Sequence, residues 1–429
     1  MHLFVVGAGY VGLVSAVGFA RLGHRVTVAD IDAPRIDRLR AGHAPLYEPG
    51  LEEAIAELAD QLAFTTDLEP PADVRQSFVA VGTPTGPDGP LSTEYVEAAV
   101  RDLLGRVGDD HTVVVRSTLP LAGPTALLAL RGGRTDGPSI VTNPEFMREG
   151  SALRDFAQPD RIVAGWLEER DQPAAAAVIE LYSGIDAPTL VADAGSVAMI
   201  KLASNVFLAM KVAYANELAR LADAFGADVR LVADGLGLDK RIGRSFLDAG
   251  PGFGGSCLPE QALALAEIAA GADVPAPLIS AVSPANGAHQ RAIVTRLGEL
   301  LGAGGLRGAK VGLLGLAFKA NTDDVRESPA LALARELRSA GAAVIATDPR
   351  AIGPALRADP ELATTTSPLE AVAGADAVLI ATEWQDYREL DWLAVAGAMR
   401  GTLVYDTRAV VDPAAVQAAG LRLERLGRR

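Results

Sequence analysis

A single cysteine stands in a glycine-rich run and is the first candidate for covalent chemistry in this chain. Cys257 is the only cysteine among 429 residues, and residues 252–259 read Gly-Phe-Gly-Gly-Ser-Cys-Leu-Pro. Glycines let the backbone adopt positive φ and approach a ligand closely. A lone thiol beside such a run is suited to act as a nucleophile, but free cysteines are also among the most buried residue types. A nucleophile and a buried structural thiol therefore both remain open from this run alone.

The other end of the chain carries the pattern of a dinucleotide site. The apolar run Leu3–Val6 predicts a buried parallel strand, residues 7–12 form a GxGxxG, and residues 13–22 predict a helix. Gly7 allows the tight turn, and Gly9 lets a pyrophosphate approach the backbone closely. Gly12 allows the helix to pack closely on the strand. This arrangement predicts a bound dinucleotide at the start of the helix.

An acid at the end of the next strand indicates which dinucleotide. Residues 25–29 predict a second strand, and Asp30 follows it about 20 residues after the glycines. A carboxylate at this place accepts a hydrogen bond from the ribose 2′-hydroxyl and repels a 2′-phosphate. The sequence therefore predicts NAD rather than NADP as the cofactor.

Composition limits the class of protein and its partners. The formal net charge of −15 argues against nucleic acid and against an anionic membrane surface as partners. The N-terminus enters a strand directly, so no signal peptide is expected, and no uninterrupted apolar stretch reaches membrane-spanning length. One cysteine suits a reducing cytoplasm. Five scattered histidines show no metal-ligand spacing, so no metal is expected.

A first α/β region follows the glycine run. Further strands are expected at 77–81, 111–116, 139–141 and 161–165. Strands that alternate with helices predict a parallel sheet, whose ligands bind at the carboxyl ends of the strands. Polar residues directly follow three of these strands, namely Thr83, Thr118 and Glu145.

The rest of the chain predicts a helical middle and a second α/β region. Residues 195–225 lack proline and have apolar residues near the helical period, which predicts one long helix. After the linker 302–305, strands are expected at 310–316, 343–348, 377–381 and 403–406, without a second GxGxxG. The predicted fold class is α/β, with two Rossmann-like doubly wound parallel-sheet domains joined by a central helical domain with one long helix. The expected domains are 1–194, 195–300 and 301–429.

Several blocks along the chain resemble one enzyme family, the nucleotide-sugar 6-dehydrogenases of the UDP-glucose/GDP-mannose dehydrogenase family, with the UDP-glucose 6-dehydrogenases nearest. The blocks cover nearly the whole length. They are GAGYVG at Gly7, YEPGL at Tyr47, TPT at Thr83, STLP at Ser117, NPEFMREGSA at Asn143, KLASNVFLAMK at Lys201, RIG at Arg241, GFGGSCLP at Gly252, GLAFKANTDDVRESPAL at Gly315 and DTR at Asp406.

The resemblance implies a reaction, a cofactor and an assembly. It implies an NAD domain, a central helical dimerisation domain and a C-terminal nucleotide-sugar domain, in a homodimer that we expect to be cytoplasmic from the cysteine content. It also implies oxidation of the C6 primary alcohol of a nucleotide sugar to a carboxylate, with two NAD reduced. The GFGGSC block is nearest to the UDP-glucose branch, so UDP-glucose oxidised to UDP-glucuronate is the expected reaction, although GDP-mannose enzymes share much of the pattern.

This chemistry explains why the matched residue types occur together. Two hydride transfers pass through an aldehyde, which a thiol such as Cys257 can hold as a thiohemiacetal and then as a thioester that water hydrolyses. Lys201 and Asn205 are four residues apart on the expected helix and share one face, so both can donate to an oxygen that becomes anionic. Thr118 and Glu145 resemble the family residues that hold and activate a water.

The resemblance also assigns binding residues. On the cofactor side it matches residues of both the first and the last α/β region, namely Gly7, Gly9, Tyr10, Val11, Gly12, Asp30, Arg35, Thr83, Thr118 and Arg326. On the substrate side it matches a set in which Arg241 is contributed across the dimer interface, namely Glu145, Phe146, Glu149, Lys201, Asn205, Arg241, Phe246, Gly254, Lys319 and Arg408.

One departure from the family pattern bears on the chemistry. The family has Lys-Asp at the third and fourth positions after the cysteine, whereas this chain has Glu260 and Gln261. A glutamine amide can position a water but cannot take its proton. Three interpretations stay open: a full four-electron dehydrogenase with Glu145 or Glu260 as base, a redox enzyme that stops at the aldehyde or epimerises, and a non-catalytic nucleotide-sugar binding protein.

Overall fold

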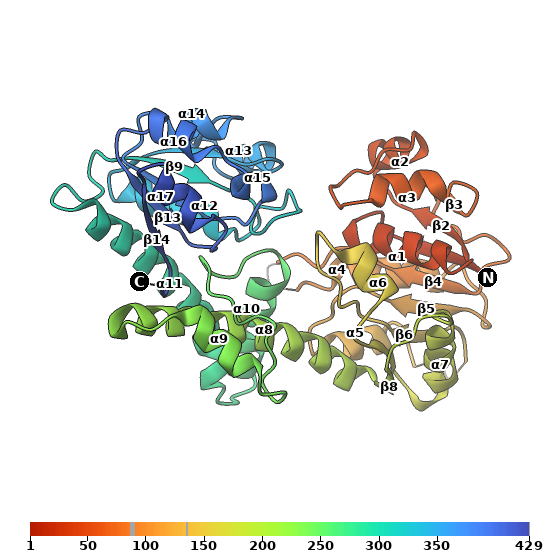
Figure 1. Ribbon diagram of the computed structural model, residues 1–429. Helices are drawn as coiled ribbons and strands as arrows, with labels where there is room; N and C mark the ends of the chain where they lie inside the picture. The colour runs from red at the N-terminus through yellow and green to blue at the C-terminus, as the bar shows by residue number, and fades with distance from the viewer. Residues whose placement is uncertain (86–90, 134–135, 429) are drawn as a thin grey trace. The chain divides into compact units, whose positions relative to one another are not determined.

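The computed structural model describes residues 1–85, 91–133 and 136–428, and the chain divides into two compact units (Figure 1). The first unit is Met1–Ser204 and the second is Asn205–Arg429. Each unit is built around one sheet. The division into three domains at residues 194 and 300 remains a prediction.

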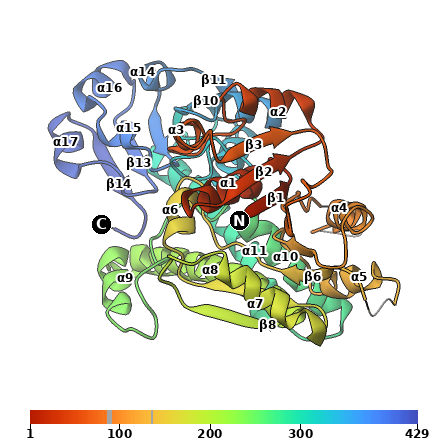
Figure 2. The same cartoon turned by 90° about the vertical axis from the view of Figure 1, so that its right-hand side faces the viewer.

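The sheet of the first unit has eight strands in the order β3-β2-β1-β4-β5-β6-β7-β8. Figure 2 shows β1, β2 and β3 side by side. The strands are β1 His2–Val6, β2 Arg25–Ala29, β3 Leu62–Thr65, β4 Gln76–Val79, β5 Thr112–Val115, β6 Ser139–Thr142, β7 Ile162–Trp166 and β8 Thr189–Asp193.

One strand departs from the expected parallel arrangement. The strand expected at 161–165 is present as β7, but it pairs antiparallel with β6, through Val141 with Trp166 and Thr142 with Gly165. The connection from β6 contains the short helix α6 (Ala152–Ala157), which packs on α1 (Tyr10–Arg21). The chain therefore re-enters the sheet in the opposite direction. The other neighbouring strands of this sheet pair in parallel.

Helices cover both faces of this sheet, and β1 shows why. Leu3 and Val5 belong to one buried cluster, while Phe4 and Val6 belong to another, because successive side chains of a strand point to opposite faces. The remaining helices of this unit are α2 Ala33–Arg40, α3 Leu51–Glu57, α4 Glu94–Leu104, α5 Gly123–Ala129, the 3₁₀ turn Glu169–Asp171 and α7 Gln172–Glu180. A fully apolar strand such as β1 needs this double cover.

The expected long helix is α8, Ala194–Phe225. It is long and apolar enough to cross a membrane by length and composition, with a mean hydropathy of 1.4 over an 18-residue window, although polar residues interrupt it. Of that window 44% is buried inside the protein. Length and hydropathy alone are thus weak evidence for a membrane span.

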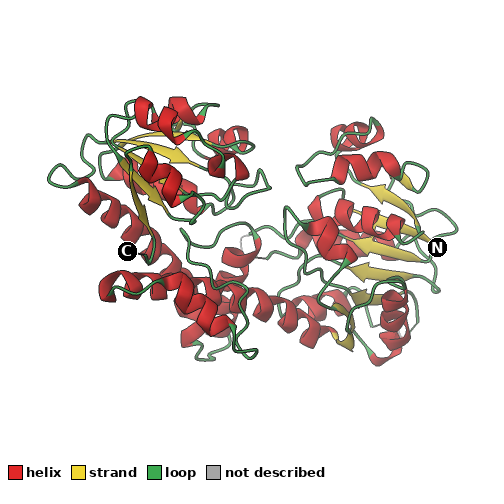
Figure 3. Cartoon of the chain, viewed as in Figure 1, coloured by secondary structure: helices red, strands yellow, loops and turns green. Residues whose placement is uncertain are grey.

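The second unit contains a six-stranded sheet in the order β11-β10-β9-β12-β13-β14, all pairs parallel. Its strands are β9 Lys310–Leu314, β10 Ala343–Thr347, β11 Ala363–Thr364, β12 Ala377–Ile380, β13 Leu403–Asp406 and β14 Arg422–Arg425. Helices flank these strands (Figure 3). The helices of this unit that follow α8 are α9 Val229–Gly237, α10 Cys257–Gly271, α11 Pro277–Leu301, α12 Pro329–Ser339, α13 Ile352–Ala358, α14 Pro368–Val372, α15 Gln385–Arg388, α16 Trp392–Ala398 and α17 Pro413–Ala418.

The second sheet repeats the first turn of the Rossmann pattern without its dinucleotide loop. Gly315 follows β9 with φ +106°, as Gly7 follows β1 with φ +107°. The acid at the end of the next strand, Asp348, accepts from the N–H groups of Leu316 and Ala317 at 2.8 and 3.0 Å and from Trp384 Nε1 at 3.1 Å. Its other carboxylate oxygen accepts from the Arg350 and Ala351 N–H groups, both at 2.8 Å. Five donors therefore occupy the carboxylate that would otherwise meet a ribose.

Candidate active site

The turn after β1 has the geometry of a dinucleotide loop. A Cβ on Gly7 would lie 2.6 Å from the Ala80 carbonyl oxygen, and a Cβ on Gly12 would lie 1.9 Å from that of Gly7. In front of Gly9, in contrast, no described atom lies within 4 Å of a built Cβ. Among the described residues no side chain caps α1, which begins at Tyr10. A helix N-terminus with open space before it is where a pyrophosphate binds.

Asp30 ends β2 beside this loop. Its carboxylate accepts from the Ala8 N–H at 2.7 Å and the Asp32 N–H at 2.9 Å, and Arg35 Nη1 lies 3.1 Å from Oδ2. A carboxylate has about four lone-pair sites, so it can also accept from a ribose hydroxyl. Arg35 and the helix residue Val11 thus lie in the neighbourhood expected of cofactor-side residues, and this part of the fold fits NAD.

Three polar residues follow adjacent parallel strands of the same sheet. Thr83 follows β4, Thr118 follows β5 and Glu145 follows β6, and these strands are consecutive neighbours. The carboxyl ends of parallel strands share one edge, which is also the edge of the Gly7 turn. The fold therefore gathers these residues on the cofactor side of the sheet.

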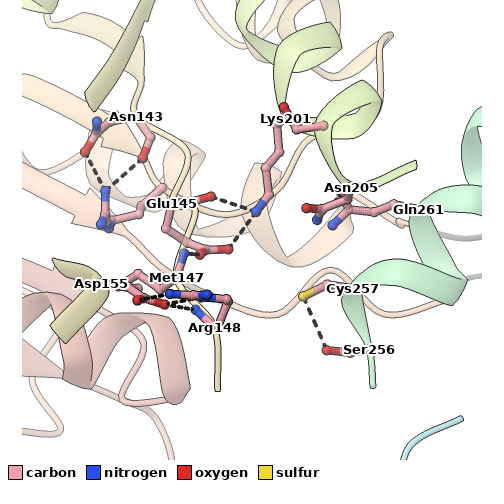
Figure 4. A network of polar contacts seen from close by, with 12 residues as sticks. Asn143, Glu145, Met147, Arg148, Asp155, Lys201, Asn205, Ser256, Cys257 and Gln261 are labelled. Atoms are coloured by element: carbon pink, nitrogen blue, oxygen red, sulfur yellow. Dashed lines mark hydrogen bonds and ion pairs between the residues drawn. The ribbon is translucent and has the colours of Figure 1, made fainter. Parts of the chain in front are cut away.

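Glu145 and Lys201 form a buried ion pair (Figure 4). Lys201 Nζ donates to Glu145 Oε1 at 2.9 Å and to the Glu145 carbonyl oxygen at 2.7 Å. The Met147 N–H donates to the other carboxylate oxygen at 2.5 Å. Both charged side chains are at least nine-tenths buried. A buried charge is stable only when it is paired and hydrogen-bonded, and both conditions hold here.

The ionisation of Glu145 follows from its neighbours. Burial by itself raises the pKa of this carboxyl, but the Lys201 charge, the hydrogen bonds from Lys201 and Met147, and the Arg116 charge together hold the pKa below its usual range. Glu145 is therefore ionised at neutral pH. In this arrangement it is a good hydrogen-bond acceptor and a weak proton acceptor.

The next residues of the same loop have different environments. The Phe146 ring has the Arg161 guanidinium 3.9 Å from its centroid and Lys201 Nζ at 5.2 Å, so cations contact it. Glu149 is half-buried, and its charge acts on the Tyr10 hydroxyl of the cofactor helix. Both residues had been matched to the substrate side, and the fold places them on the loop that carries Glu145.

Arg116 is a residue that sequence reasoning missed. Its guanidinium is buried and donates to Ser15 Oγ at 2.7 Å, Asn143 Oδ1 at 2.6 Å and the Tyr182 hydroxyl at 2.9 Å. These contacts are all with neutral groups, so the positive charge remains to favour the ionised form of Glu145. The sequence did offer one signal for a buried functional arginine, because Arg116 stands at the end of an apolar strand, directly before Ser117.

In the second unit, Asn205 and Gln261 pair through their amides. Asn205 Nδ2 donates to Gln261 Oε1 at 2.9 Å, and Gln261 is buried. An aspartate at position 261 would accept the same hydrogen bond. Gln261 thus keeps an oxygen that accepts from Asn205, but unlike an aspartate it carries no negative charge and cannot take a proton.

Cys257 is exposed and is the first residue of α10. Its Sγ lies 3.7 Å from Ser256 Oγ (Figure 4). The positive end of a helix dipole favours a thiolate at this position. The alternative of a buried structural cysteine is wrong for this fold, because the thiol is open to solvent.

Three buried side chains that sequence reasoning also missed hold the loop before the cysteine. Asn286 accepts from the Phe253 N–H at 3.0 Å and donates to its carbonyl oxygen at 2.9 Å. His289 Nε2 lies 2.8 Å from the Gly250 carbonyl oxygen, and Asn216 Oδ1 accepts from the Gly250 N–H at 2.9 Å. These residues come from α8 and α11, and only the folded chain shows that they contact this loop.

The same loop packs against the residue pair Phe318–Lys319. A Cβ on Gly254 would lie 2.4 Å from the Glu327 carbonyl oxygen, and a Cβ on Gly255 would lie 2.9 Å from the Phe318 ring. Lys319 Nζ is 5.3 Å from the centroid of that ring. Only glycine allows this close approach, which explains the glycine run.

Arg408 reaches the same region from the end of β13. It donates from Nη2 to the Phe318 carbonyl oxygen at 3.0 Å, and its Nη1 would lie 3.2 Å from a Cβ on Gly250. Phe246, just before the loop, has φ +64°, an unusual backbone conformation for a non-glycine residue. The fold thus brings Gly254, Lys319 and Arg408 together around one loop.

Two predicted arginines have other partners in the single chain. Arg241 is exposed and pairs with Asp239 at 2.6 Å. Arg326 pairs with Asp324 at 2.6 Å, and its carbonyl oxygen accepts from the Gly255 N–H at 3.0 Å. Arg326, which had been matched to the cofactor side, therefore supports the cysteine loop through its backbone.

A cavity of about 580 Å³ adjoins Arg408 in the second unit. Its lining contains both arginines and acids, namely Arg230, Arg244, Arg388, Arg408, Arg428, Asp234, Asp248, Glu383 and Asp406. Guanidinium groups are suited to bind phosphate oxygens. Part of this charge is already balanced, since Arg244 pairs with Asp234 and Asp248 and Arg408 pairs with Glu383.

Comparison with known proteins agrees with this arrangement. Residues 1–186, 196–288 and 312–413 match the NAD binding, central and UDP binding domains of the UDP-glucose/GDP-mannose dehydrogenase family. The chain belongs to this family. It is accordingly an NAD-dependent oxidoreductase of nucleotide sugars, which confirms the predicted fold class, enzyme class and cofactor.

Individual relatives extend over the whole chain. A UDP-glucose 6-dehydrogenase of Rhizobium meliloti (strain 1021) is 40% identical, with 100% of both chains covered. The structure of a UDP-glucose dehydrogenase from Pyrobaculum islandicum is similar with a TM-score of 0.85 and 41% identity, covering 96% of this chain and 97% of that one. A UDP-D-ManNAc dehydrogenase structure from Pyrococcus horikoshii also has a TM-score of 0.85, at 25% identity and with 100% and 99% covered.

Proposed function

We propose that the protein oxidises the C6 primary alcohol of UDP-glucose to the carboxylate of UDP-glucuronate. The observation that carries this proposal is the exposed thiol of Cys257 at the start of α10. The loop that leads to it lies near Lys319 and Arg408. The relatives named for UDP-glucose, at about 40% identity, favour this sugar. The fold neighbour named for UDP-D-ManNAc shows that the fold alone does not select it.

Cys257 would retain the aldehyde between the two oxidations. When bound, NAD accepts one hydride from C6 in each oxidation, so two are reduced per sugar. The thiolate adds to the aldehyde carbon to give a thiohemiacetal, whose oxidation leaves a thioester. Water then cleaves the C–S bond, which releases the acid and restores the thiol. A solvent-exposed thiol meets the requirement that substrate and water both reach it.

Lys201 and Asn205 are the proposed donors to the oxygen that becomes anionic in each step. They are one turn apart on α8, and both carry N–H donors. The hydrogen bonds of Lys201 to Glu145 fix the ammonium group in place before substrate binds. Preorganised donors of this kind stabilise the developing charge without further rearrangement.

Thr118 and Glu145 are proposed to hold the hydrolytic water. Glu145 is ionised, so it can orient a water through a hydrogen bond, but its lowered pKa makes it a weak base. Gln261 can accept or donate a hydrogen bond but cannot take a proton. Thioester hydrolysis is therefore expected to be the slow step, with Glu145 or Glu260 as the proton acceptor.

The nucleotide part of the substrate requires positive charge and backbone donors. Lys319, Arg408 and the loop from Phe246 to Gly254 are proposed to bind it, since the fold gathers them in one unit beside a cavity lined by arginines and acids. Glu149 and Phe146 are proposed on the sugar side, as the family resemblance implies. Charge complementarity with a pyrophosphate supports this assignment.

We infer a cytoplasmic homodimer in which Arg241 reaches the neighbouring site. Supporting this, α8 exposes apolar side chains at heptad spacing, namely Phe207, Tyr214 and Leu221, followed by Phe225. An exposed apolar stripe of this length is typical of a surface that another chain covers. The exposed Arg241 pairs with a neighbouring aspartate, Asp239, on the protein surface.

The alternative functions, an enzyme that stops at the aldehyde or epimerises the sugar and a non-catalytic binding protein, rest on the presence of Gln261 instead of an aspartate. A chain that stops at the aldehyde or epimerises would form one NADH per sugar, or none net, and a binding protein would form none. The test is the NADH yield per sugar with a panel of nucleotide sugars, together with product masses. Two NADH and an acid from UDP-glucose are expected, whereas one NADH with an aldehyde would contradict the four-electron reaction.

A further inference from the structure

The first unit contains a buried carboxylate that none of the assignments above uses. Glu48 lies between α2 and α3 and is buried. Its Oε2 accepts from the Tyr10 hydroxyl, through a short hydrogen bond, and from the Gly150 N–H at 2.6 Å. Its Oε1 accepts from the Ala152 N–H at 2.8 Å. One side chain therefore joins two segments that are far apart in the sequence.

The donors belong to the two ligand-side segments of this unit. Tyr10 is the first residue of α1, the helix whose N-terminus follows the glycine turn. Gly150 and Ala152 end the segment that begins after β6 and carries Glu145 and Glu149. Glu48 thus connects the cofactor helix with the loop proposed to meet the sugar.

Packing makes this connection stiff. A Cβ on Gly18 of α1 would lie 2.2 Å from the Phe156 ring of α6, so the two helices are in direct contact. Asp155 accepts from the Arg148 N–H at 2.9 Å and from its guanidinium at 2.9 and 2.6 Å, which holds the loop before α6 in one conformation. A shift at the start of α1 would therefore be transmitted to this loop rather than absorbed.

The hydrogen bond from Tyr10 persists over the physiological pH range. Burial and the neighbouring Glu48 carboxylate raise the pKa of the Tyr10 hydroxyl above its ordinary value. The phenol is therefore a hydrogen-bond donor whenever Glu48 is present to accept.

We propose that Glu48 is a positioning residue that couples binding of the dinucleotide at α1 to binding of the nucleotide sugar at residues 145–152. This inference rests on the function proposed above. Because coupling between two binding sites is reciprocal, each ligand should tighten the other by the same factor. Removal of the Tyr10 hydroxyl or of the Glu48 charge should reduce that factor while both sites remain formed.

The test is the dissociation constant of NADH, measured by its fluorescence, with and without saturating UDP-glucose, a pair that cannot turn over. In the wild-type protein UDP-glucose should tighten NADH about fivefold or more. In Tyr10→Phe and Glu48→Gln the factor should fall to about twofold or less. In Glu48→Gln, which lies outside the assigned cofactor-binding set, NADH alone should bind within about threefold of wild type. Tyr95→Phe, at an exposed tyrosine of α4, is the matched control and should keep the wild-type factor.

Each result decides for or against the role of Glu48. If Glu48→Gln fails to fold, Tyr10→Phe still tests the coupling, because it removes only the hydroxyl that donates to Glu48. A wild-type protein that oxidises UDP-glucose but binds the two ligands independently overturns the coupling, as does a folded Tyr10→Phe that keeps the full factor. Absence of NADH formation with any nucleotide sugar would instead contradict the proposed function.

Discussion

Gln261 can keep a structural hydrogen bond while lacking the ability of an aspartate to accept a proton. Its Oε1 accepts from Asn205 at 2.9 Å, as an aspartate would. The amide cannot then serve as the base that removes a proton from water. If the proposed cysteine chemistry holds, we expect Gln261 to leave thioester formation unaffected and to slow thioester hydrolysis.

The first prediction concerns an adduct on Cys257. General-base assistance is typically worth about 10²–10⁴-fold, so its loss should let a covalent species accumulate when the protein is mixed with UDP-glucose and NAD. Intact-protein mass spectrometry should detect this adduct, and Cys257→Ser should abolish it. Gln261→Asp, ideally with Glu260→Lys, should remove the adduct and raise the rate of acid formation.

The control for this prediction is Gln417→Asp, at an exposed glutamine of α17, which should change neither quantity. Acid formation without any adduct in the wild-type protein, unchanged in Gln261→Asp, would mean that another group supplies the base. Glu145 is then the candidate.

The second prediction concerns cofactor choice at Asp30. Asp30→Ala removes the acceptor for the ribose and also for the Ala8 and Asp32 N–H groups, whereas Asp30→Asn keeps an acceptor and removes the charge. Loss of a charged hydrogen bond costs about 1.5–3 kcal/mol, so NAD should bind roughly 10- to 100-fold more weakly in Asp30→Ala. The NADP-to-NAD ratio of affinities should rise in both variants.

Fluorescence titration with NADH and NADPH measures both constants. Asp37→Asn, at an exposed acid of α2, should leave them unchanged. A wild-type protein that prefers NADP would show that the role of Asp30 has been misassigned.

At the scale of elements, α11 does more than fill a core. Its residues Asn286 and His289 hydrogen-bond the backbone of the loop that leads to Cys257. His289 Nδ1 lies 2.7 Å from an Arg220 guanidinium nitrogen on α8 and therefore accepts, so the ring is neutral. The His289 imidazole thus links α8, through Arg220, to the loop that leads to Cys257.

The third prediction is a pH-dependent loss of stability through His289. Burial, reinforced by the Arg220 charge, lowers the pKa of His289 from 6.5 to about 4. The unfolded chain then binds the proton first, so this contribution to stability is full above pH 6.5 and is lost as pH falls towards about 4. The loss is on the order of 3 kcal/mol.

Urea unfolding at pH 7 and pH 4 measures this loss. His289→Gln keeps a donor and an acceptor without a titrating group, so its stability should fall less between the two pH values. His111, which has a pKa also lowered to about 4, contributes equally to both proteins and cancels in the comparison. The exposed His43→Gln is the control, and an equal pH dependence in wild type and His289→Gln would contradict the assignment.

At the scale of the whole molecule, the proposed homodimer rests on the exposed apolar stripe of α8 and on the exposed Arg241. Phe207, Tyr214 and Leu221 recur at intervals of seven residues on one face. A symmetric dimer would cover the same stripe on both subunits. Arg241 could then complete a site that a single chain leaves without it.

The fourth prediction is complementation between two inactive variants. Arg241→Ala and Cys257→Ser should each be inactive alone. In a mixed dimer, the subunit with an intact cysteine receives Arg241 from its partner, so an equilibrated equal mixture should regain about a quarter of wild-type activity. Activity assays after subunit exchange, with light scattering for mass, measure this. No recovery in confirmed mixed dimers, or full activity in a monomer, would refute the shared site.

The sequence by itself determined the local patterns. The first strand, the glycine turn, the helix after it and Asp30 could all be predicted, because each depends on neighbours within about 30 residues. The long helix was predicted to within one residue of its start at Ala194. The nucleophile candidate also came from a local run, since glycines around a single cysteine are visible without a structure. Matched blocks then supplied the family and the cofactor.

Only the tertiary structure decided which distant residues act on these patterns. Contacts between segments more than 30 residues apart include Arg116 with Ser15, Asn286 and His289 with the cysteine loop, and Glu48 with Ala152. The reversed direction of β7 likewise appears only in the folded chain. Such contacts depend on how helices pack on sheets, and no periodicity or spacing encodes a particular partner. The ionisation of Glu145 is decided at the same level, because a carboxyl that burial alone would neutralise stays charged beside Lys201.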